Sequence, residues 1–248
     1  MITWQAGKIV EKKQWATDLY SIKIDADLFP FKAGQFTNIG IEREDGMIYR
    51  PYSLVNSPDD VLLEVHFNTV KDGRFSPLLA ELDVNTPISV ANRAGGLLTL
   101  DQVPETRTEL WFCATATGIG PFLSILNTTE LWQRFDKVVV CYATKTAADM
   151  AYRDALNALL IQHPTQFRFA PFITRETADG AIHSRFTTYL ESGDLEDLVG
   201  IAFDVDSSHI MLCGSSVMIT DMTRLLEQKG LRRHSRQQPG HIAIEKYF

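Results

Sequence analysis

Cysteine is scarce in this sequence, and the three cysteines that occur are far apart, at Cys113, Cys141 and Cys213. Each lies within an apolar stretch. An odd number of widely separated cysteines argues against a disulfide framework, and no Cys-x-x-Cys pair is present to bind a metal. We therefore expect no metal site and no iron–sulfur cluster carried by the chain itself.

Long apolar runs are also missing. The longest run drawn only from apolar residues covers positions 138–143, far short of the roughly 20 residues needed to cross a bilayer. Residues 1–8 contain neither the basic region nor the apolar region of a secretory signal. The sequence therefore predicts a cytoplasmic protein without a membrane span.

Positive charge is in deficit, because 24 Lys and Arg residues face 31 Asp and Glu residues, giving a net charge of −7. This balance excludes a general attraction to nucleic acid or to an anionic membrane. Any basic binding surface must be local. With 248 residues, of which 45% are apolar and 22% charged, the chain is long and apolar enough for one or two folded domains.

Up to about residue 100 the sequence alternates polar and apolar residues in short runs separated by turn residues. A period of two with frequent turns predicts antiparallel strands that form a barrel or a sandwich. Ser76 and Pro77 begin a run of helix formers, so we expect one short helix there with Ser76 as its cap. The expected strands cover residues 8–11, 19–24, 35–39, 62–67 and 88–90.

After a polar connector at residues 101–106 the pattern changes to continuous apolar runs separated by helix-length segments. Such runs are typical of strands covered on both faces, and their alternation with helices predicts a parallel α/β sheet. We therefore expect an antiparallel β domain at residues 1–101 and a parallel α/β domain at residues 102–248. The expected strands cover residues 110–114, 137–142, 167–169, 209–213 and 242–245, and the expected helices cover residues 119–132, 147–162 and 216–229.

A turn of small residues and glycines at positions 114–122 follows the first buried strand and precedes a helix. Gly118 and Gly120 would let backbone N–H groups approach a pyrophosphate, and the helix N-terminus would add partial positive charge. Pro121 suits the first helical turn. The third glycine of the dinucleotide-binding fingerprint is missing, and the alternative is a tight strand-to-helix turn that binds no ligand.

Cations follow the next strands of the expected parallel sheet. Lys145 stands where an NAD site would carry an acidic residue for the ribose 2′-hydroxyl, and a cation there favours a 2′-phosphate. Arg175 and Arg185 fall at the same carboxyl edge and could complete an anion clamp. The alternative is that all three are solvated surface residues.

In the first domain a guanidinium, an aromatic ring and a hydroxyl occur together at Arg50, Tyr52 and Ser53. Such a strand offers positive charge to a phosphate and a ring for stacking. Taken alone, an edge strand with an inward-pointing tyrosine explains these residues better. The order and spacing of four segments change this balance in favour of a ligand: residues 50–53, 73–76, 117–122 and 213–215.

With these four ordered segments the whole chain resembles the ferredoxin–NADP⁺ reductase family, and most closely its bacterial ferredoxin (flavodoxin)–NADP⁺ reductases, including the ending at residues 239–248. The resemblance implies a two-domain β and α/β fold. An N-terminal antiparallel Greek-key β-barrel would bind FAD, and a C-terminal parallel, Rossmann-like α/β sheet would bind NADP. It also implies reversible electron transfer between NADPH and ferredoxin or flavodoxin, with a C-terminal tail closing over the FAD.

The resemblance further implies roles for individual residues. Arg50 would hold the FAD pyrophosphate, Tyr52 would pack on the isoalloxazine, and Ser53 would lie near flavin N5. The FAD set is Arg50, Pro51, Tyr52, Ser53, His66, Asn68, Thr69, Arg74, Phe75, Ser76, Thr117, Tyr247 and Phe248. The NADP set is Thr117, Gly118, Thr144, Lys145, Thr174, Arg175, Arg185, Cys213 and Gly214. The catalytic set is Ser53, Cys213, Glu245 and Tyr247.

Several of these residues have alternatives. Cys213 considered alone is a buried strand-end thiol, and His66 is a core or edge histidine. Glu245 would relay protons or orient the nicotinamide. Pro51 stands where the family often has alanine, and Lys145 stands where it often has arginine. A lysine lacks the bidentate fork of arginine, so the preference for NADP would be weaker.

Three arginines, Arg232, Arg233 and Arg236, crowd a segment without acidic residues near the C-terminus. An acidic carrier such as ferredoxin or flavodoxin could dock there, although charge runs usually form a solvated face. The alternative activities are NAD(P)H-dependent reduction of free flavin, a quinone or an oxygenase, and a non-enzymatic nucleotide-sensing or nucleic-acid-binding module. We expect a monomer with neither nucleic acid nor membrane as a partner.

Overall fold

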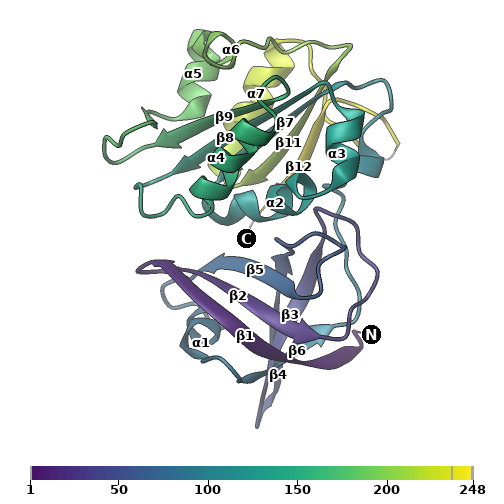
Figure 1. Cartoon of the computed structure of the whole chain (residues 1–248), viewed down its shortest axis with the longest axis vertical. Helices are drawn as coiled ribbons and strands as arrows, with labels where there is room; N and C mark the ends of the chain where they lie inside the picture. The colour runs from purple at the N-terminus through teal and green to yellow at the C-terminus, as the bar shows by residue number, and fades with distance from the viewer. Residues whose placement is uncertain (1, 236, 247–248) are drawn as a thin grey trace. The chain divides into compact units, whose positions relative to one another are not determined.

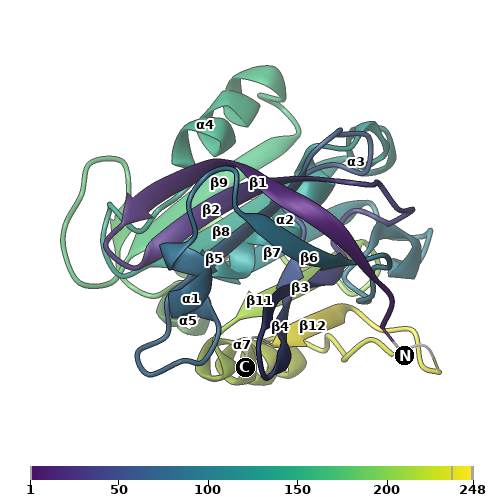
Figure 2. The same ribbon diagram turned by 90° about the horizontal axis from the view of Figure 1, so that it is seen from below.

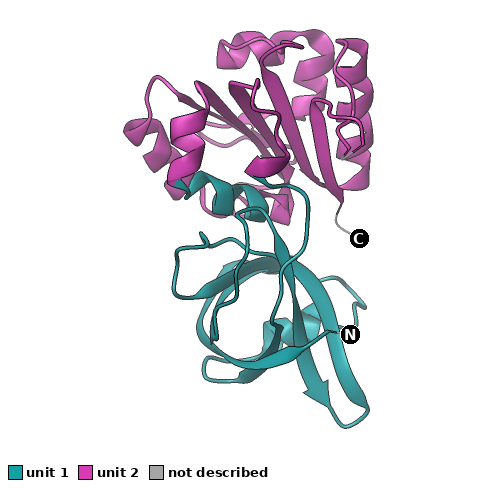
Figure 3. Cartoon of the chain, turned by 90° about the vertical axis from the view of Figure 1, so that its right-hand side faces the viewer, with its two compact units in different colours: residues 1–99, 120–128 teal, residues 100–119, 129–248 magenta. Residues whose placement is uncertain are grey.

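The structure, a computed structural model, describes residues 2–235 and 237–246. The chain divides into two compact units, which are coloured separately in Figure 3. Unit 1 comprises Met1–Thr99 and Gly120–Thr128, and unit 2 comprises Leu100–Ile119 and Thr129–Phe248. The division after Thr99 lies close to the expected boundary. Residues 120–128, in contrast, belong to unit 1 rather than to the second domain.

Unit 1 is built on a six-stranded antiparallel sheet with the strand order β4-β3-β6-β1-β2-β5 (Figure 1). β6 is inserted between β3 and β1, as in a Greek key. An antiparallel bridge between Leu54, just after β4, and Val65 in β5 joins the two ends of this order and closes the barrel. The strands are β1 Trp4–Ala16, β2 Leu19–Ala26, β3 Phe36–Arg43, β4 Gly46–Ser53, β5 Leu63–Asn68 and β6 Pro87–Ala91.

The barrel core follows from the two-residue period of its strands. Ile9 on β1 and Ile22 and Ile24 on β2 have no exposed surface. On the outer side, Lys23 and Glu11 reach solvent and form an ion pair of 2.9 Å. Each buried aliphatic side chain stabilises the fold by about 1.5–3 kcal/mol, whereas an exposed ion pair contributes about 1 kcal/mol or less. The alternating apolar residues therefore determine which face of each strand is buried.

A short helix, α1, begins where the sequence predicts it, but the prediction of its cap is wrong. Phe75 occupies the cap position, and the helix start has no side-chain cap hydrogen bond. The Ser76 hydroxyl instead accepts a hydrogen bond from the Val70 N–H at 2.9 Å. This bond closes the loop that leads into the helix. The two helices of unit 1 are α1 Ser76–Glu81 and α2 Gly120–Leu126.

Unit 2 is built on a six-stranded sheet in which all neighbouring strands are parallel, in the order β10-β9-β8-β7-β11-β12. Cys113 in β7 lies opposite both Cys141 in β8 and Leu212 in β11, so the carboxyl ends of these strands reach one edge. The two sheets confirm the expected fold class. The strands are β7 Glu109–Thr115, β8 Lys137–Thr144, β9 Phe167–Ile173, β10 Ile182–His183, β11 Ser208–Gly214 and β12 Ile242–Lys246.

Helices cover both faces of the parallel sheet. Figure 2 shows α4 on one side of the sheet and α7 on the other. In the described part of the chain, none of the helices is long and apolar enough to cross a membrane. The helices of unit 2 are α3 Thr129–Arg134, α4 Arg153–Gln162, α5 Phe186–Ser192, α6 Asp194–Val199 and α7 Ser216–Gln228.

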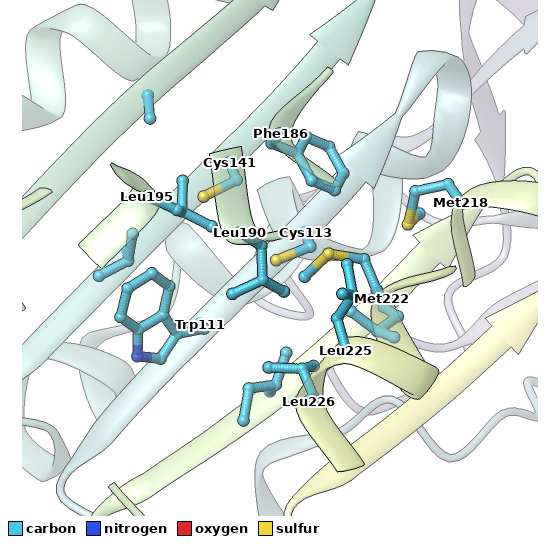
Figure 4. Packing of buried hydrophobic residues seen from close by; sticks show 14 of the residues in the cluster. Trp111, Cys113, Cys141, Phe186, Leu190, Leu195, Met218, Met222, Leu225 and Leu226 are labelled. Carbon is cyan, nitrogen blue, oxygen red and sulfur yellow. The ribbon is translucent and has the colours of Figure 1, made fainter. Parts of the chain in front are cut away.

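The core between the sheet and α5–α7 is shown in Figure 4. Trp111, Cys113 and Cys141 from the strands and Met222 and Leu226 from α7 have no exposed surface. A hydrogen bond with the Cys141 thiol, together with burial, raises the pKa of the Cys113 thiol. The raised pKa keeps the Cys113 thiol protonated and unreactive, and the buried Cys141 packs beside it in the core.

The expected single helix at residues 119–132 is in fact two helices, α2 and α3. The helix ends before Thr128, whose hydroxyl donates to the Ile125 carbonyl at 2.7 Å and so competes with the helical backbone pattern. The Ser124 hydroxyl donates to the Asn56 carbonyl at 2.6 Å, and this buried bond ties α2 to unit 1.

Two further helices, α5 and α6, are not predicted by the sequence pattern. They have only seven and six residues and are separated by Gly193, which has a left-handed φ of 89°. Segments this short do not display a helical period. The expected helix at residues 147–162 begins only at Arg153, because Tyr152 adopts a left-handed backbone with a φ of 60°.

A buried histidine at the start of β11 makes the stability of the fold depend on pH. His209 has no exposed surface, and its ring lies 5.6 Å from the ring of His234. Burial, with smaller contributions from the positive charges of His234, Arg107 and His241, lowers the pKa of His209 to about 3. The folded chain therefore keeps this ring neutral at a pH where the unfolded chain, with a histidine pKa of about 6.5, binds a proton.

Acidification from about pH 7 to about pH 5 should lower the free energy of unfolding by about 2 kcal/mol through His209, because only the unfolded state binds the proton in this range. In the His209→Leu variant, the free energy of unfolding should no longer contain this contribution to its pH dependence. His183→Leu, which replaces an exposed histidine, is the matched control and should keep it. Urea unfolding at both pH values, followed by circular dichroism, measures the difference. The same pH dependence in His209→Leu as in the unchanged chain would contradict a neutral His209.

Candidate functional site

The turn after β7 brings two strand ends into close contact. In the 3₁₀ turn Ala116–Ile119, a Cβ atom on Gly118 would lie 2.2 Å from the Cys213 carbonyl oxygen. Gly214 has a φ of 144°, and a Cβ atom there would lie 2.1 Å from the Thr115 hydroxyl oxygen. Only glycine fits at these two positions, so the ends of β7 and β11 pack backbone against backbone.

The start of α7 lies directly after this contact. The Ser215 hydroxyl accepts a hydrogen bond from the Met218 N–H at 3.2 Å, and the Ser215 N–H donates to the Thr115 hydroxyl at 2.9 Å. α7 has 13 residues, and its first N–H groups and dipole give this edge a partial positive charge. Ser215 is not among the expected site residues, although a serine directly before a helical segment is a recognisable cap signal.

A cavity of about 410 Å³ opens at the carboxyl ends of β7, β8 and β9, between these strands and the first turns of α5 and α7. Five residues of the expected NADP set line it: Thr144, Lys145, Thr174, Arg175 and Arg185. Other lining residues, such as Thr187 and Val217, come from α5 and α7 and are not predicted, because no local pattern marks them.

The charge of this cavity is mainly positive. Lys145, Arg175 and Arg185 are exposed, and among the described residues that line the cavity Asp221 is the only one with a carboxylate. Within residues 2–235 and 237–246, none of the three cations forms an ion pair. A neighbouring hollow of about 440 Å³ shares Arg175 and Arg185. Two guanidinium groups and an ammonium without carboxylate partners fit a phosphate.

Backbone hydrogen bonds hold two of these cations at a fixed spacing. The Thr174 N–H donates to the Thr144 carbonyl at 3.1 Å, and the Arg175 N–H donates to the Lys145 carbonyl at 2.9 Å. The parallel ladder of β8 and β9 thus continues into the loops that follow them. The side chains of Lys145 and Arg175 therefore leave neighbouring points of the same sheet edge.

The expected FAD residues on β4 differ in exposure: Arg50 and Pro51 are exposed, Tyr52 is half-buried and Ser53 is buried. The Tyr52 ring lies 5.7 Å from the Phe67 ring and 6.0 Å from the Phe75 ring. Burial raises the pKa of Tyr52, so its hydroxyl stays protonated at neutral pH. Tyr52 is therefore held in an aromatic cluster and remains partly accessible to solvent.

Two expected residues near the end of β5 make contacts inside unit 1. The Nδ1 atom of His66 lies 3.0 Å from the Tyr20 carbonyl oxygen and 3.0 Å from the Ser21 hydroxyl oxygen. Burial lowers the pKa of His66 to about 4, so the ring is neutral at neutral pH. The Thr69 hydroxyl donates to the Asp18 carboxylate at 2.9 Å. These contacts fix the orientation of both side chains.

The remaining expected FAD residues of unit 1 are Asn68, Arg74, Phe75 and Ser76. Asn68 and Arg74 are exposed, whereas Phe75 and Ser76 are buried. Arg74 therefore presents a second cation in unit 1, beside the first turn of α1, and its two buried neighbours support the loop from within.

The expected catalytic residues that the structure describes lie on separate elements. In unit 2, Cys213 on β11 is buried and lies opposite the half-buried Glu245 on β12. Thr117, which is expected in the FAD and NADP sets and not in the catalytic set, is buried in the 3₁₀ turn. Ser53 is buried in unit 1. In the described ranges, no group of three or more His, Cys, Asp or Glu side chains is placed to hold a metal ion.

Two of the expected docking arginines, Arg232 and Arg233, lie near the amino ends of the parallel strands, away from the cavity. Arg232 and Arg233 are exposed, and Arg233 pairs with Ile242, the first residue of β12. Ile242 pairs with Ile210, four residues before Gly214, which corresponds to about 13 Å along a strand. Arg236, Tyr247 and Phe248, which were also expected in functional roles, lie outside the described residues.

Comparison with known proteins covers the whole chain. This chain is 39% identical in sequence to the flavodoxin/ferredoxin–NADP reductase of Escherichia coli (strain K12), and the alignment covers all of both chains. It is 33% identical to ferredoxin–NADP reductase A of Sorangium cellulosum, covering 97% of this chain and 88% of that one. The chain belongs to the flavodoxin/ferredoxin–NADP reductase family.

A solved member of this reductase family has the same fold. The ferredoxin NADP⁺ reductase from Neisseria gonorrhoeae, solved with bound FAD and NADP, is 29% identical and superposes with a TM-score of 0.94 over all of both chains. The family model described as an oxidoreductase NAD-binding domain matches residues 112–224. This match includes the glycine turn, the cation-lined cavity and most of α7.

The contact between the ends of β7 and β11 should make Gly118 sensitive to substitution. Gly118→Ala should lower the free energy of unfolding by roughly 2–4 kcal/mol, because backbone must move to admit the Cβ atom. Gly120→Ala is the matched control, since its Cβ atom would meet nothing nearer than Val55 at 3.6 Å. Thermal unfolding followed by circular dichroism compares the two variants. Equal melting temperatures would contradict the close packing at Gly118.

Proposed function

We propose that this chain binds FAD in unit 1 and NADP(H) in unit 2, and transfers electrons reversibly between NADPH and ferredoxin or flavodoxin. FAD, when bound, supplies the conversion between a two-electron hydride and single electrons. The observation that carries this proposal is the cavity in which Lys145, Arg175 and Arg185 gather beside the glycine turn. The family membership supports the same activity.

The cations of the cavity suit the ribose 2′-phosphate. Each charge-assisted contact with a phosphate contributes about 1.5–3 kcal/mol before solvent screening reduces it. The 2′-phosphate is absent from NADH, so these contacts favour NADPH selectively. In the proposal, Thr117, Thr144 and Thr174 offer hydroxyls, and Gly118 and Gly214 let the nucleotide approach the backbone. Cys213 and Glu245 are proposed to act near the nicotinamide.

The exposed groups of unit 1 suit a flavin dinucleotide. Arg50 and Arg74 are exposed cations that fit its phosphates, and the partly exposed Tyr52 is proposed to offer its ring to the isoalloxazine. Ser53 is proposed to hold a hydroxyl near flavin N5. The remaining proposed FAD contacts are Pro51, His66, Asn68, Thr69, Phe75, Ser76 and Thr117.

Purified protein should be yellow with about one noncovalent FAD per chain, and NADPH should reduce it faster than NADH. Lys145→Ala, Arg175→Ala and Arg185→Ala should each raise the KM for NADPH by about tenfold and leave the KM for NADH nearly unchanged. Absorbance spectra and steady-state kinetics with both nucleotides measure these effects.

Arg224→Ala is the matched control for the three cavity variants. Arg224 is an exposed arginine on α7 that lies 3.6 Å from Glu191 and does not line the cavity. Its removal should change neither KM. A colourless protein that takes up no added FAD would contradict the flavin site, and equal losses with NADPH and NADH would contradict the 2′-phosphate site.

We further propose that Arg232, Arg233 and Arg236 steer an acidic carrier toward the protein. We also propose that the protein acts as a monomer in the cytoplasm. Because Arg232 and Arg233 lie at the edge opposite Gly214, their effect is on the rate of encounter. Such long-range steering acts over about 30 Å at about 0.01 M salt but only about 8 Å at about 0.15 M salt.

The double variant Arg232→Ala/Arg233→Ala should slow electron transfer to ferredoxin or flavodoxin several-fold at low salt and have little effect at physiological salt. Stopped-flow kinetics over a salt series measures the second-order rate constant. Reduction of a small uncharged acceptor is the control and should not respond to the substitutions. An unchanged rate constant with the carrier at low salt would rule out steering by these arginines.

A further inference from the structure

Glu176 connects the two loops that carry Lys145 and Arg175. It directly follows Arg175 in the loop after β9. Its Oε1 atom accepts a hydrogen bond from the Ala147 N–H at 2.7 Å. Ala147 lies two residues after Lys145, in the loop after β8. One carboxylate thus ties the loops together beyond the last backbone pair, in which the Arg175 N–H donates to the Lys145 carbonyl at 2.9 Å.

Within the described residues, the other side-chain bonds of residues 145–149 stay inside this loop, and Arg153 at the start of α4 donates to the Asp179 carbonyl of the loop after β9 at 2.6 Å. The Thr144 hydroxyl donates to the Thr146 carbonyl at 2.8 Å. The Thr146 N–H and hydroxyl both bond the Asp149 carboxylate, at 3.1 and 2.8 Å. These contacts give the loop a shape but do not attach it to β9. The bond from the Ala147 N–H to Glu176 is therefore the contact nearest to Lys145 that fixes this loop against the neighbouring loop beyond the Lys145 carbonyl.

The carboxylate of Glu176 also has an electrostatic effect of the opposite sign. Glu176 is exposed and is adjacent in sequence to Arg175, whose side chain lines the cavity. A negative charge near a phosphate site weakens anion binding, although water and salt screen the effect at an exposed position. The hydrogen bond and the charge of Glu176 thus act in opposite directions on an anionic ligand.

We propose that Glu176 is a positioning residue for the anion site of unit 2. Its carboxylate holds the Lys145 loop against the Arg175 loop, so that both cations meet one phosphate, while its charge moderates the affinity. The inference rests on the proposed function in one respect, namely that the anion is the 2′-phosphate of NADP(H). Separating the hydrogen bond from the charge tests it.

Glu176→Gln keeps an oxygen acceptor for the Ala147 N–H and removes the charge, so it should bind 2′-phospho-AMP about twofold more tightly than the unchanged chain. Glu176→Ala removes both, and should bind this ligand about fivefold more weakly than Glu176→Gln. Isothermal titration calorimetry on the purified holoprotein gives the dissociation constants. Titration with 5′-AMP, which lacks the 2′-phosphate, should show less than about twofold change in either variant.

Asp179 provides the matched control. It lies three residues further along the same loop and is exposed, and within the described residues its carboxylate accepts no hydrogen bond. Asp179→Asn and Asp179→Ala should bind 2′-phospho-AMP equally well, since neither removes a connection between loops. We expect the affinity for 2′-phospho-AMP to differ between Glu176→Gln and Glu176→Ala but not between Asp179→Asn and Asp179→Ala. This difference would indicate that Glu176 connects the two loops.

Hydrogen exchange at the Ala147 amide gives a second measurement that needs no ligand. Glu176→Ala should accelerate this exchange about fivefold, and Glu176→Gln should leave it within about twofold. Equal affinity of the Gln and Ala variants for 2′-phospho-AMP, or unchanged exchange in Glu176→Ala, would overturn the proposal.

The failure of the proposed function would look different. In that case the unchanged chain would bind 2′-phospho-AMP no more tightly than 5′-AMP. The exchange measurement would then still decide whether Glu176 holds the two loops together.

Discussion

The parallel register of β7, β8, β9 and β11 is the constraint on which the candidate site depends. Parallel strands require cover on both faces, which apolar residues such as Trp111 and Val139 supply at full burial. Once the register is fixed, every residue that follows a strand is delivered to the same edge. Lys145 and Arg175 follow β8 and β9, and Gly214 ends β11. Apolar burial in the centre of the sheet thus brings together polar groups that are distant in sequence.

Close backbone packing adds a second constraint at this edge. Gly118 and Gly214 each leave no room for a side chain because the opposite strand end, at Cys213 and Thr115, lies in contact. The Ser215 N–H then bonds the Thr115 hydroxyl, so the start of α7 is fixed relative to β7. The glycines therefore have a structural role within unit 2 that is independent of any ligand.

Sequence patterns predict those parts of the molecule that repeat over many residues. The alternating strands of unit 1 and the apolar strands of unit 2 were recoverable because burial imposes a period of two or a continuous run. The sequence predicts that the cations at positions 145, 175 and 185 lie near one another, because the carboxyl ends of the strands in a parallel sheet share an edge. The short helices α5 and α6 carry too few residues to show a period.

Contacts between distant residues account for the remaining differences. Thr128 divides one expected helix into two through its bond to Ile125, and the bond from Ser124 to Asn56 assigns α2 to unit 1. Ser76 satisfies Val70 rather than capping its own helix. In each case a single polar side chain forms a hydrogen bond with a group that no local sequence pattern identifies. These hydrogen bonds depend on which groups the fold brings within hydrogen-bond distance of each other.

The overall charge explains why positioning matters at the anion site. A chain with a net charge of −7 repels a nucleotide phosphate at long range. In the proposed function, the attraction therefore comes from short-range contacts with Lys145, Arg175 and Arg185, whose exposed side chains lose conformational entropy when they are held in one geometry. A carboxylate that ties the loop of Lys145 to the loop of Arg175 limits the conformations from which these two cations bind. On this argument the negative charge of Glu176 is compatible with an anion site, since the order that it imposes outweighs the attraction that it removes.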